Sequence, residues 1–153
     1  MEAIPVKIST RGRYALRMML DIALHQEETA VSLKSVAQRQ EISVKYLEQI
    51  VTPLVRGGHL RASRGAQGGY QLCRPPEEYT VGDILRTIEG SHAPVACLSE
   101  DAAPCLRAEQ CATVEVYRRI DQAIDQVVDH ITLGDLVKLQ YEKWGSNTPP
   151  ERT

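Results

Sequence analysis

The sequence predicts a mainly α fold, a winged helix-turn-helix domain with a two-stranded wing, followed by a long C-terminal dimerisation helix. Three observations predict it. Two short amphipathic helices with a tight turn between them begin after Ser32 and Ser43. A glycine-hinged hairpin follows over 60–72, and apolar residues repeat at helical spacing from Ala112 to about His130.

Charge divides the 153-residue chain into two unequal parts. The net charge is only -2, but residues 1–75 carry 11 basic and 6 acidic side chains, whereas residues 76–153 carry 7 and 14. A basic surface is what counter-ion release from DNA phosphates requires, so the acidic part should stay off the duplex. We therefore expect a DNA-binding domain over 1–76, a sensor loop and dimerisation helix over 77–145, and a disordered tail over 146–153.

Composition predicts a cytoplasmic protein that is not an enzyme. The longest apolar run near the N-terminus is interrupted by Arg17 and Asp21, so no signal peptide or membrane span is expected. Four cysteines in such a chain are more often reduced, metal-binding or redox-active than paired in disulfides. Neither a phosphate-cradling glycine loop nor a nucleophile placed beside a base is visible in the sequence.

A first helix is predicted from a cap at Ser9 or Thr10 to about His25. Its apolar residues are too many for one narrow stripe, so we expect the winged domain to cover one side and another element the other side. Arg11 lies near the start of this helix, where it could reach a phosphate or act only as a surface residue.

The helix-turn-helix is centred on the turn Gln40-Glu41-Ile42. Ser32 and Ser43 are good caps, because a serine oxygen can accept a free N–H of the first helical turn. In the second helix, apolar residues recur at helical spacing: Tyr46, Leu47, Ile50, Val51 and Leu54. Pro53 lies inside this helix and predicts either a kink or a break.

The start of the second helix is the part of such a motif that enters the major groove. We therefore predict DNA contacts from five residues there: Ser43, Val44, Lys45, Tyr46 and Glu48. A carboxylate near phosphates is unfavourable, so Glu48 indicates base readout, for example of cytosine N4. The alternative is a winged helix that contacts only proteins, with these charges merely solvated.

The wing is predicted as two strands, Leu60–Arg64 and Gly69–Leu72, joined by a glycine-rich turn. Arg61 and Arg64 lie on it, where they can meet phosphates or a narrow minor groove. Cys73, at the end of the second strand, is interpreted as a packing residue.

The C-terminal part begins with a helix from Val81 to Glu89, for which Thr80 and Asp83 resemble a capping pair. The long helix from Ala112 then carries an apolar seam at spacings of three and four: Tyr117, Ile120, Ile124, Val127 and Ile131.

Because this helix projects from a small domain, we expect its partner to be a second copy, in a two-fold homodimer that places two reading helices about one DNA turn apart. Packing only on its own domain is the alternative. A last short helix, capped by Thr132 and running from Leu133 to Tyr141, can fold back.

Residues 91–111 lose all periodicity and contain three cysteines, Cys97, Cys105 and Cys111. Their spacing lacks the close pairs of a zinc ribbon. Three thiolates in one irregular loop fit an iron–sulfur cluster, although reduced thiols in a floppy loop are also consistent with the pattern. Cys111 would lie at the N-terminus of the long helix, where the helix dipole lowers the pKa of a thiol.

Four segments of the chain resemble the Rrf-two (Rrf2) family of transcriptional regulators: Ile8–Leu16, Ile42–Gln49, Arg64–Tyr70 and Ile131–Leu136. The resemblance covers about residues 6–140. It implies a homodimeric winged-helix transcription factor that binds double-stranded DNA and dimerises through a long C-terminal helix.

The resemblance also implies a cofactor. In the IscR-like and NsrR-like members, three cysteines of the equivalent loop bind an iron–sulfur cluster, which implies that role for the three loop cysteines and favours a 2Fe-2S cluster. The positions that supply the fourth ligand in those members are Val114 and Arg13 here, so that ligand is unassigned. Glu115 and His92 are the candidates.

The predicted function is a sequence-specific DNA-binding repressor that senses iron–sulfur or redox status through the cysteine loop. The alternative comes from CymR-like members, which the N-terminal half closely resembles. Those members lack the cysteine trio and respond through a protein partner. In that case the chain is a cluster-free regulator of sulfur or cysteine metabolism, with cysteines that are incidental or directly oxidised.

Overall fold

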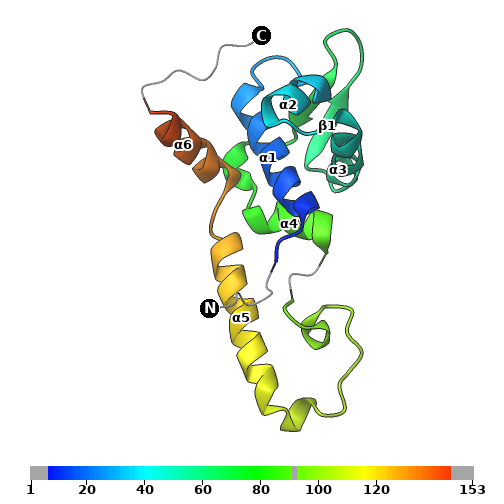
Figure 1. The fold of residues 1–153 in the computed structure, drawn as a ribbon, viewed down its shortest axis with the longest axis vertical. Helices are drawn as coiled ribbons and strands as arrows, with labels where there is room; N and C mark the ends of the chain where they lie inside the picture. The colour runs from blue at the N-terminus through cyan, green and yellow to red at the C-terminus, as the bar shows by residue number, and fades with distance from the viewer. Residues whose placement is uncertain (1–6, 91–92, 146–153) are drawn as a thin grey trace.

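The computed structural model describes residues 7–90 and 93–145 (Figure 1). The predicted fold class is confirmed, since the described chain is mainly helical with one two-stranded antiparallel sheet. The elements in chain order are α1 (Thr10–His25), α2 (Leu33–Gln40), α3 (Val44–Arg56), β1 (Leu60–Ser63), β2 (Gly69–Leu72), η1 (Pro76–Glu78), α4 (Val81–Glu89), η2 (Ala96–Leu98), η3 (Ala108–Gln110), α5 (Ala112–Val128) and α6 (Leu133–Trp144).

Side-chain caps define where most of these helices begin. The cap oxygen accepts a backbone N–H three residues later at Ser9, Ser32, Ser43, Thr80 and Thr132. The last two form full capping boxes, in which Asp83 and Asp135 accept the N–H of the cap residue in return. The helix starts that the sequence predicted are therefore confirmed.

α1 forms the centre of the core. Met18, Met19 and Ile22 are fully buried, and the helix contacts α2, α3 and β2 of the winged domain as well as α4 and α6. The expected cover on two sides is confirmed, and its second part is α4 together with the folded-back α6.

The turn of the helix-turn-helix is tight because Glu41 adopts a left-handed conformation, with φ of 55°. The next N–H, from Ile42, donates to the carbonyl of Ala37 at 3.2 Å, and the Ile42 side chain is buried. α3 runs through Pro53, so a break there is excluded. It ends at Gly57 and is followed by Gly58, whose φ of 74° suits glycine.

The wing pairs Leu60 with Leu72 and Ser63 with Gly69 at its two ends. Arg64 follows β1 instead of ending it, a one-residue correction to the predicted strand. A third segment, which the sequence did not predict, joins the wing at Val31, whose N–H and C=O both pair with Tyr70 at 2.9 and 2.8 Å. A Cβ at position 69 would overlap the carbonyl of Val31, so this close approach requires glycine.

Tyr79 is fully buried and secures the exit from the wing. Its hydroxyl donates to the His59 carbonyl at 2.7 Å and accepts the N–H groups of Cys73 and Arg74 at 3.0 and 3.1 Å. The Cys73 side chain is exposed, so the interpretation of this cysteine as a packing residue is wrong. Only the backbone N–H of Cys73 makes this contact with Tyr79, and the side chain faces solvent.

The 93–111 loop leads away from the winged domain, and α5 begins at the far end of the molecule and runs back toward that domain (Figure 1). The junction between α5 and α6 is fastened to the start of α4, where Val81 N–H donates to Ile131 at 2.9 Å and Leu133 N–H donates to Tyr79 at 2.8 Å. α6 then folds back onto α1 and η1 and ends at Trp144, three residues beyond the predicted Tyr141. None of the helices in the described ranges is both long and apolar enough to span a membrane.

Candidate DNA interface and cysteine loop

α3 presents one buried face and one exposed face. Leu47, Ile50 and Leu54 are fully buried, and the five residues proposed to touch DNA lie elsewhere on the helix. Of those, Ser43, Val44, Lys45 and Glu48 are exposed. This placement agrees with the predicted reading face.

Tyr46 differs from the other four. It is half-buried, and its ring packs edge-on against Tyr14 of α1 with centroids 5.4 Å apart. The ring therefore fixes α3 against α1. Only the exposed part of the Tyr46 side chain is available for the predicted contact with DNA.

Two further exposed residues lie on the face that is predicted to read DNA, and they were not singled out from the sequence. Gln49 and Thr52 lie four residues after Lys45 and Glu48, and all four side chains are exposed. Thr52 Oγ1 donates to the Glu48 carbonyl at 3.0 Å. The spacing of i to i+4 from Lys45 and Glu48 could have identified these two residues from the sequence. A carboxamide such as that of Gln49 commonly hydrogen-bonds adenine in the major groove.

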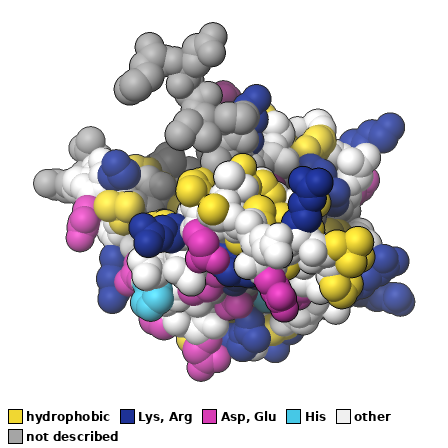
Figure 2. All heavy atoms as spheres, turned by 90° about the horizontal axis from the view of Figure 1, so that it is seen from below, with side chains coloured by type: hydrophobic (Ala, Val, Ile, Leu, Met, Phe, Trp, Pro, Cys, Tyr) yellow, Lys and Arg dark blue, Asp and Glu magenta, His cyan; other side chains and the backbone are white. Residues whose placement is uncertain are grey.

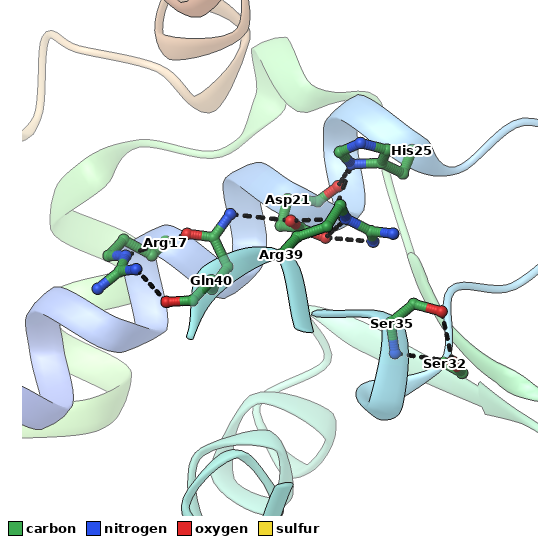
Figure 3. Close-up of polar contacts among 7 residues, drawn as sticks. All are labelled: Arg17, Asp21, His25, Ser32, Ser35, Arg39 and Gln40. Carbon is green, nitrogen blue, oxygen red and sulfur yellow. Dashed lines mark hydrogen bonds and ion pairs between the residues drawn. The ribbon is translucent and has the colours of Figure 1, made fainter. Parts of the chain in front are cut away.

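A buried ion pair holds the end of α2, immediately before the turn (Figure 3). The Asp21 carboxylate of α1 is 1% exposed and accepts from Arg39 Nη2 at 2.6 Å, Arg39 Nε at 3.0 Å and Gln40 Nε2 at 2.9 Å. Arg17, also on α1, donates to the Gln40 carbonyl and, at 3.1 Å, to its side-chain oxygen. These contacts attach the helix-turn-helix to α1, and sequence periodicity contains no signal for them.

The remaining basic candidates are exposed. Arg61 lies in β1, Arg64 follows it at the wing turn, and Arg11 lies in the first turn of α1. All three are therefore available to a phosphate backbone, and their contact with DNA stays a prediction.

His59 is a buried residue at the base of the wing. Its Nδ1 lies 3.3 Å from Arg74 Nη2, and since arginine only donates, Nε2 must carry the proton that it donates to Thr87 Oγ1 at 2.7 Å. The pKa of His59 is lowered, first by burial and next by the charge of Arg74, with Asp83 opposing. The neutral ring thus joins the wing to α4.

The three loop cysteines differ in surroundings. Cys97 and Cys105 are exposed, and Cys111 is half-buried at the N-cap of α5. Across the described ranges, no three His, Cys, Asp or Glu side chains form a group that could hold a metal ion. Three thiols have the chemistry that iron–sulfur clusters prefer, but the loop in this conformation does not gather them.

Cys111 has a thiol with a lowered pKa. Its Sγ lies 3.3 Å from Thr113 Oγ1, and this hydrogen bond is the main cause of a lowered pKa, followed by the N–H of Val114. The predicted direction is confirmed, and donors of the first helical turn produce it.

The fourth ligand remains a prediction. Val114, at the position that supplies it in IscR-like members, is buried. Glu115 is exposed and forms an ion pair with Arg118 at 2.6 Å. His92 lies outside the described residues.

The apolar seam of α5 is only partly covered within one chain. The buried residues of α5 are Val114 and Val128, which lie outside the seam. Of the seam residues, Val127 is 56% exposed and Ile131 is 36% exposed. The other three seam residues, Tyr117, Ile120 and Ile124, are half-buried. From the end of the molecule where α5 lies, hydrophobic side chains reach the surface among charged ones (Figure 2).

Val116 is a further exposed apolar residue of α5, at 57%. It lies about three turns before Val127 and on the same side of the helix, so it widens the seam. The seam listed from the sequence omitted it because the spacing of three and four starts at Tyr117.

Comparison with known proteins agrees with this architecture. Residues 8–139 match the Rrf2 family model, described as an iron-dependent transcriptional regulator. The transcriptional regulator CymR of Bacillus subtilis is 44% identical over 131 residues, which cover 86% of this chain and 89% of CymR.

Two solved structures have the same fold. That of CymR from B. subtilis, described as the global cysteine regulator, has a TM-score of 0.75 and 42% identity and covers 87% of this chain and 97% of its own. That of IscR from T. potens also has a TM-score of 0.75, with 37% identity over 98% of this chain and 97% of its own. The chain belongs to the Rrf2 family of transcriptional regulators.

Proposed function

We propose that the protein is a sequence-specific DNA-binding repressor that acts as a homodimer. The observation that carries the proposal is the two-faced α3, which buries Leu47, Ile50 and Leu54 while exposing Lys45, Glu48 and Gln49 beside a basic wing. A helix fixed on one side and polar on the other is suited to the major groove.

The homodimer is supported by the exposed part of the α5 seam. Burying Val127 and Ile131 against a second copy would remove apolar surface from water, and a two-fold pair would present two copies of α3 to one face of the DNA. Analytical ultracentrifugation tests this part, with a dimer at micromolar concentration expected and a monomer contradicting it.

The signal that controls DNA binding is proposed to be an iron–sulfur cluster of the 2Fe-2S type on Cys97, Cys105 and Cys111. The donor chemistry fits, since all three residues are free thiols, two of them exposed and the third half-buried, and the pKa of Cys111 is lowered. When bound, the cluster would supply an iron- and redox-sensitive link between these sulfurs. The chain's own part is to close the loop around them, beside both α4 and α5.

Anaerobic reconstitution with visible absorption, iron analysis and DNA titration tests the sensor. We expect a coloured protein whose affinity for a selected duplex differs between the loaded and empty forms. Cys105→Ala should lose the colour and the difference, whereas Cys73→Ala is the matched control, because Cys73 is exposed and lies outside the loop. A colourless wild-type protein, or a Cys105→Ala variant with an unchanged response, contradicts the proposal.

A second candidate function is a cluster-free regulator of cysteine metabolism controlled by a protein partner. It is favoured by the 44% identity to CymR and by the absence of a preformed metal group among the described residues. DNA titration before and after iron–sulfur reconstitution separates the two, because this candidate predicts sequence-specific binding that reconstitution does not change and that changes only when a partner protein is added.

A further inference from the structure

We propose that Arg86 is a positioning residue that transmits the state of the cysteine loop to the winged domain. This inference rests on the proposed function, because it names the route by which the loop would change DNA binding. It is carried by three observations: a forked ion pair, a glycine that makes room for it, and a cavity that the loop shares.

The ion pair joins two parts of the molecule. Arg86 belongs to α4, whose buried side packs in the winged domain. Its guanidinium donates to both oxygens of Asp129, at 2.6 and 2.8 Å, and to Asp125 Oδ1 at 2.9 Å. Asp125 is on α5 and Asp129 is its C-cap, so one side chain of α4 forms ion pairs with the last turn of the predicted dimerisation helix.

Gly82 makes these ion pairs possible. It is buried in the first turn of α4, one turn before Arg86. A Cβ built at this position would overlap Asp129 Oδ1 and would lie 2.6 Å from Arg86 Nη1. The absence of a side chain at Gly82 therefore provides the space in which Arg86 and Asp129 meet.

Residues of the cysteine loop line the same cavity as Arg86. This cavity of about 550 Å³ lies between α4, α5 and the loop, and its walls include Arg86, Asp125, Leu98, Glu100 and Asp101. Leu98 is adjacent to Cys97, and Glu100 and Asp101 follow it. Carboxylates of the loop and of α5 therefore line one cavity with Arg86, so a movement of the loop around a cluster would change the charges near this arginine.

The ion pair is partly open to solvent, so its contribution to the stability of the fold is small. The side chains of Arg86, Asp125 and Asp129 are 36%, 47% and 36% exposed, and ion pairs this open to solvent contribute little to stability. Their geometry is nevertheless specific, because the planar guanidinium holds both oxygens of Asp129 and one of Asp125 in a fixed arrangement, which the rotatable ammonium of a lysine does not impose. The hydrogen bond from Val81 to Ile131 lies at the same junction and serves as its pivot.

The experiment measures the ratio of DNA affinities of the loaded and empty full-length protein. For the wild type we expect a ratio of about tenfold or more. Arg86→Gln and Arg86→Lys should bring the ratio close to one while cluster absorbance, dimerisation and circular dichroism stay unchanged. Gly82→Ala should act in the same direction without altering any charge.

Arg119→Gln is the matched control, because Arg119 is an exposed arginine of the same helix α5 and its replacement removes the same charge. It should keep the wild-type ratio. If Arg86→Gln keeps that ratio too, or if Arg119→Gln loses it equally, the inference is overturned while the proposed function stands. A wild-type ratio of one overturns the proposed function and, with it, the inference.

Discussion

At the residue scale, Asp21 is the side chain on which the geometry of the helix-turn-helix depends. It is buried, and four of its hydrogen bonds come from Arg39 and Gln40, the last two residues of α2. Removing one partner of a buried ion pair leaves the other charge uncompensated, which costs about 3 kcal/mol or more.

We expect Asp21→Ala to lower the free energy of unfolding by about 3 kcal/mol in urea denaturation. Adding Arg39→Met should restore part of the lost stability, because the double variant has apolar side chains at both positions and no unpaired charge. It should not restore DNA affinity, because the hydrogen bonds that attach α2 to α1 at Asp21 are still missing. If Asp21→Ala is as stable as the wild type, the ion pair does not stabilise the fold. If the double variant has wild-type DNA affinity, the ion pair does not position α2 for DNA binding.

His59 makes stability depend on pH. Its folded pKa is lowered from 6.5 by burial, so the unfolded chain takes up the proton first as pH falls. Well above pH 6.5, the protonation of His59 therefore does not change the free energy of unfolding. As the pH falls from 6.5 to the lower folded pKa, it reduces this free energy progressively, and below the folded pKa the reduction is complete. His59→Gln should show a flatter decline in melting temperature between pH 7 and pH 5, and an unchanged slope would exclude His59 as its source.

At the scale of elements, α3 and the wing should contribute differently to DNA binding. Arg64→Ala should weaken binding to many sequences and lower the slope of log K against log salt by about one, because a phosphate contact is lost. Glu48→Ala should instead change which sequences are bound, with about 1–3 kcal/mol of discrimination lost at one base pair. Fluorescence anisotropy on a selected duplex and its single-base variants distinguishes them. Equal, sequence-independent weakening by both would refute the assignment.

α5 offers a test of dimerisation that leaves the single chain intact. Val127 is 56% exposed, so Val127→Glu should not unfold the protein but should bury a charge in the dimer, raising its dissociation constant by about 30-fold or more. Gln122→Glu adds the same charge to the opposite, exposed side of α5 and is the control. Sedimentation velocity that shows equal dimerisation of both variants would place the interface elsewhere.

At the scale of the whole molecule, the sequence predicted what depends on local chemistry. Caps such as Ser43 and Thr132 set the helix starts, and the alternating residues of 60–72 set the wing. Periodicity identifies which face of a helix is apolar, but it does not identify which polar groups meet over a distance. The pairs between Asp21 and Arg39 and between Arg86 and Asp129 were therefore missed.

The same reasoning explains the errors and the open questions. Cys73 was interpreted as a packing residue of the wing strand, yet the strand ends at Leu72 and the bend that follows exposes the cysteine. The exposed side of α3 could be anticipated because its buried residues recur every three to four positions, and its contact with DNA stays a prediction. The cysteine loop has no periodicity, so only the type and number of its thiols carried information.

The central claim is that one dimer reads DNA through α3 and is controlled through Cys97, Cys105 and Cys111. The most direct measurement is an anaerobic titration of a duplex, selected from random sequences, with the loaded and the empty protein. The account predicts at least about a thousandfold preference over random DNA in one form and a clear loss of that preference in the other. Equal affinity for selected and random duplexes, or the same preference in both forms, would contradict it.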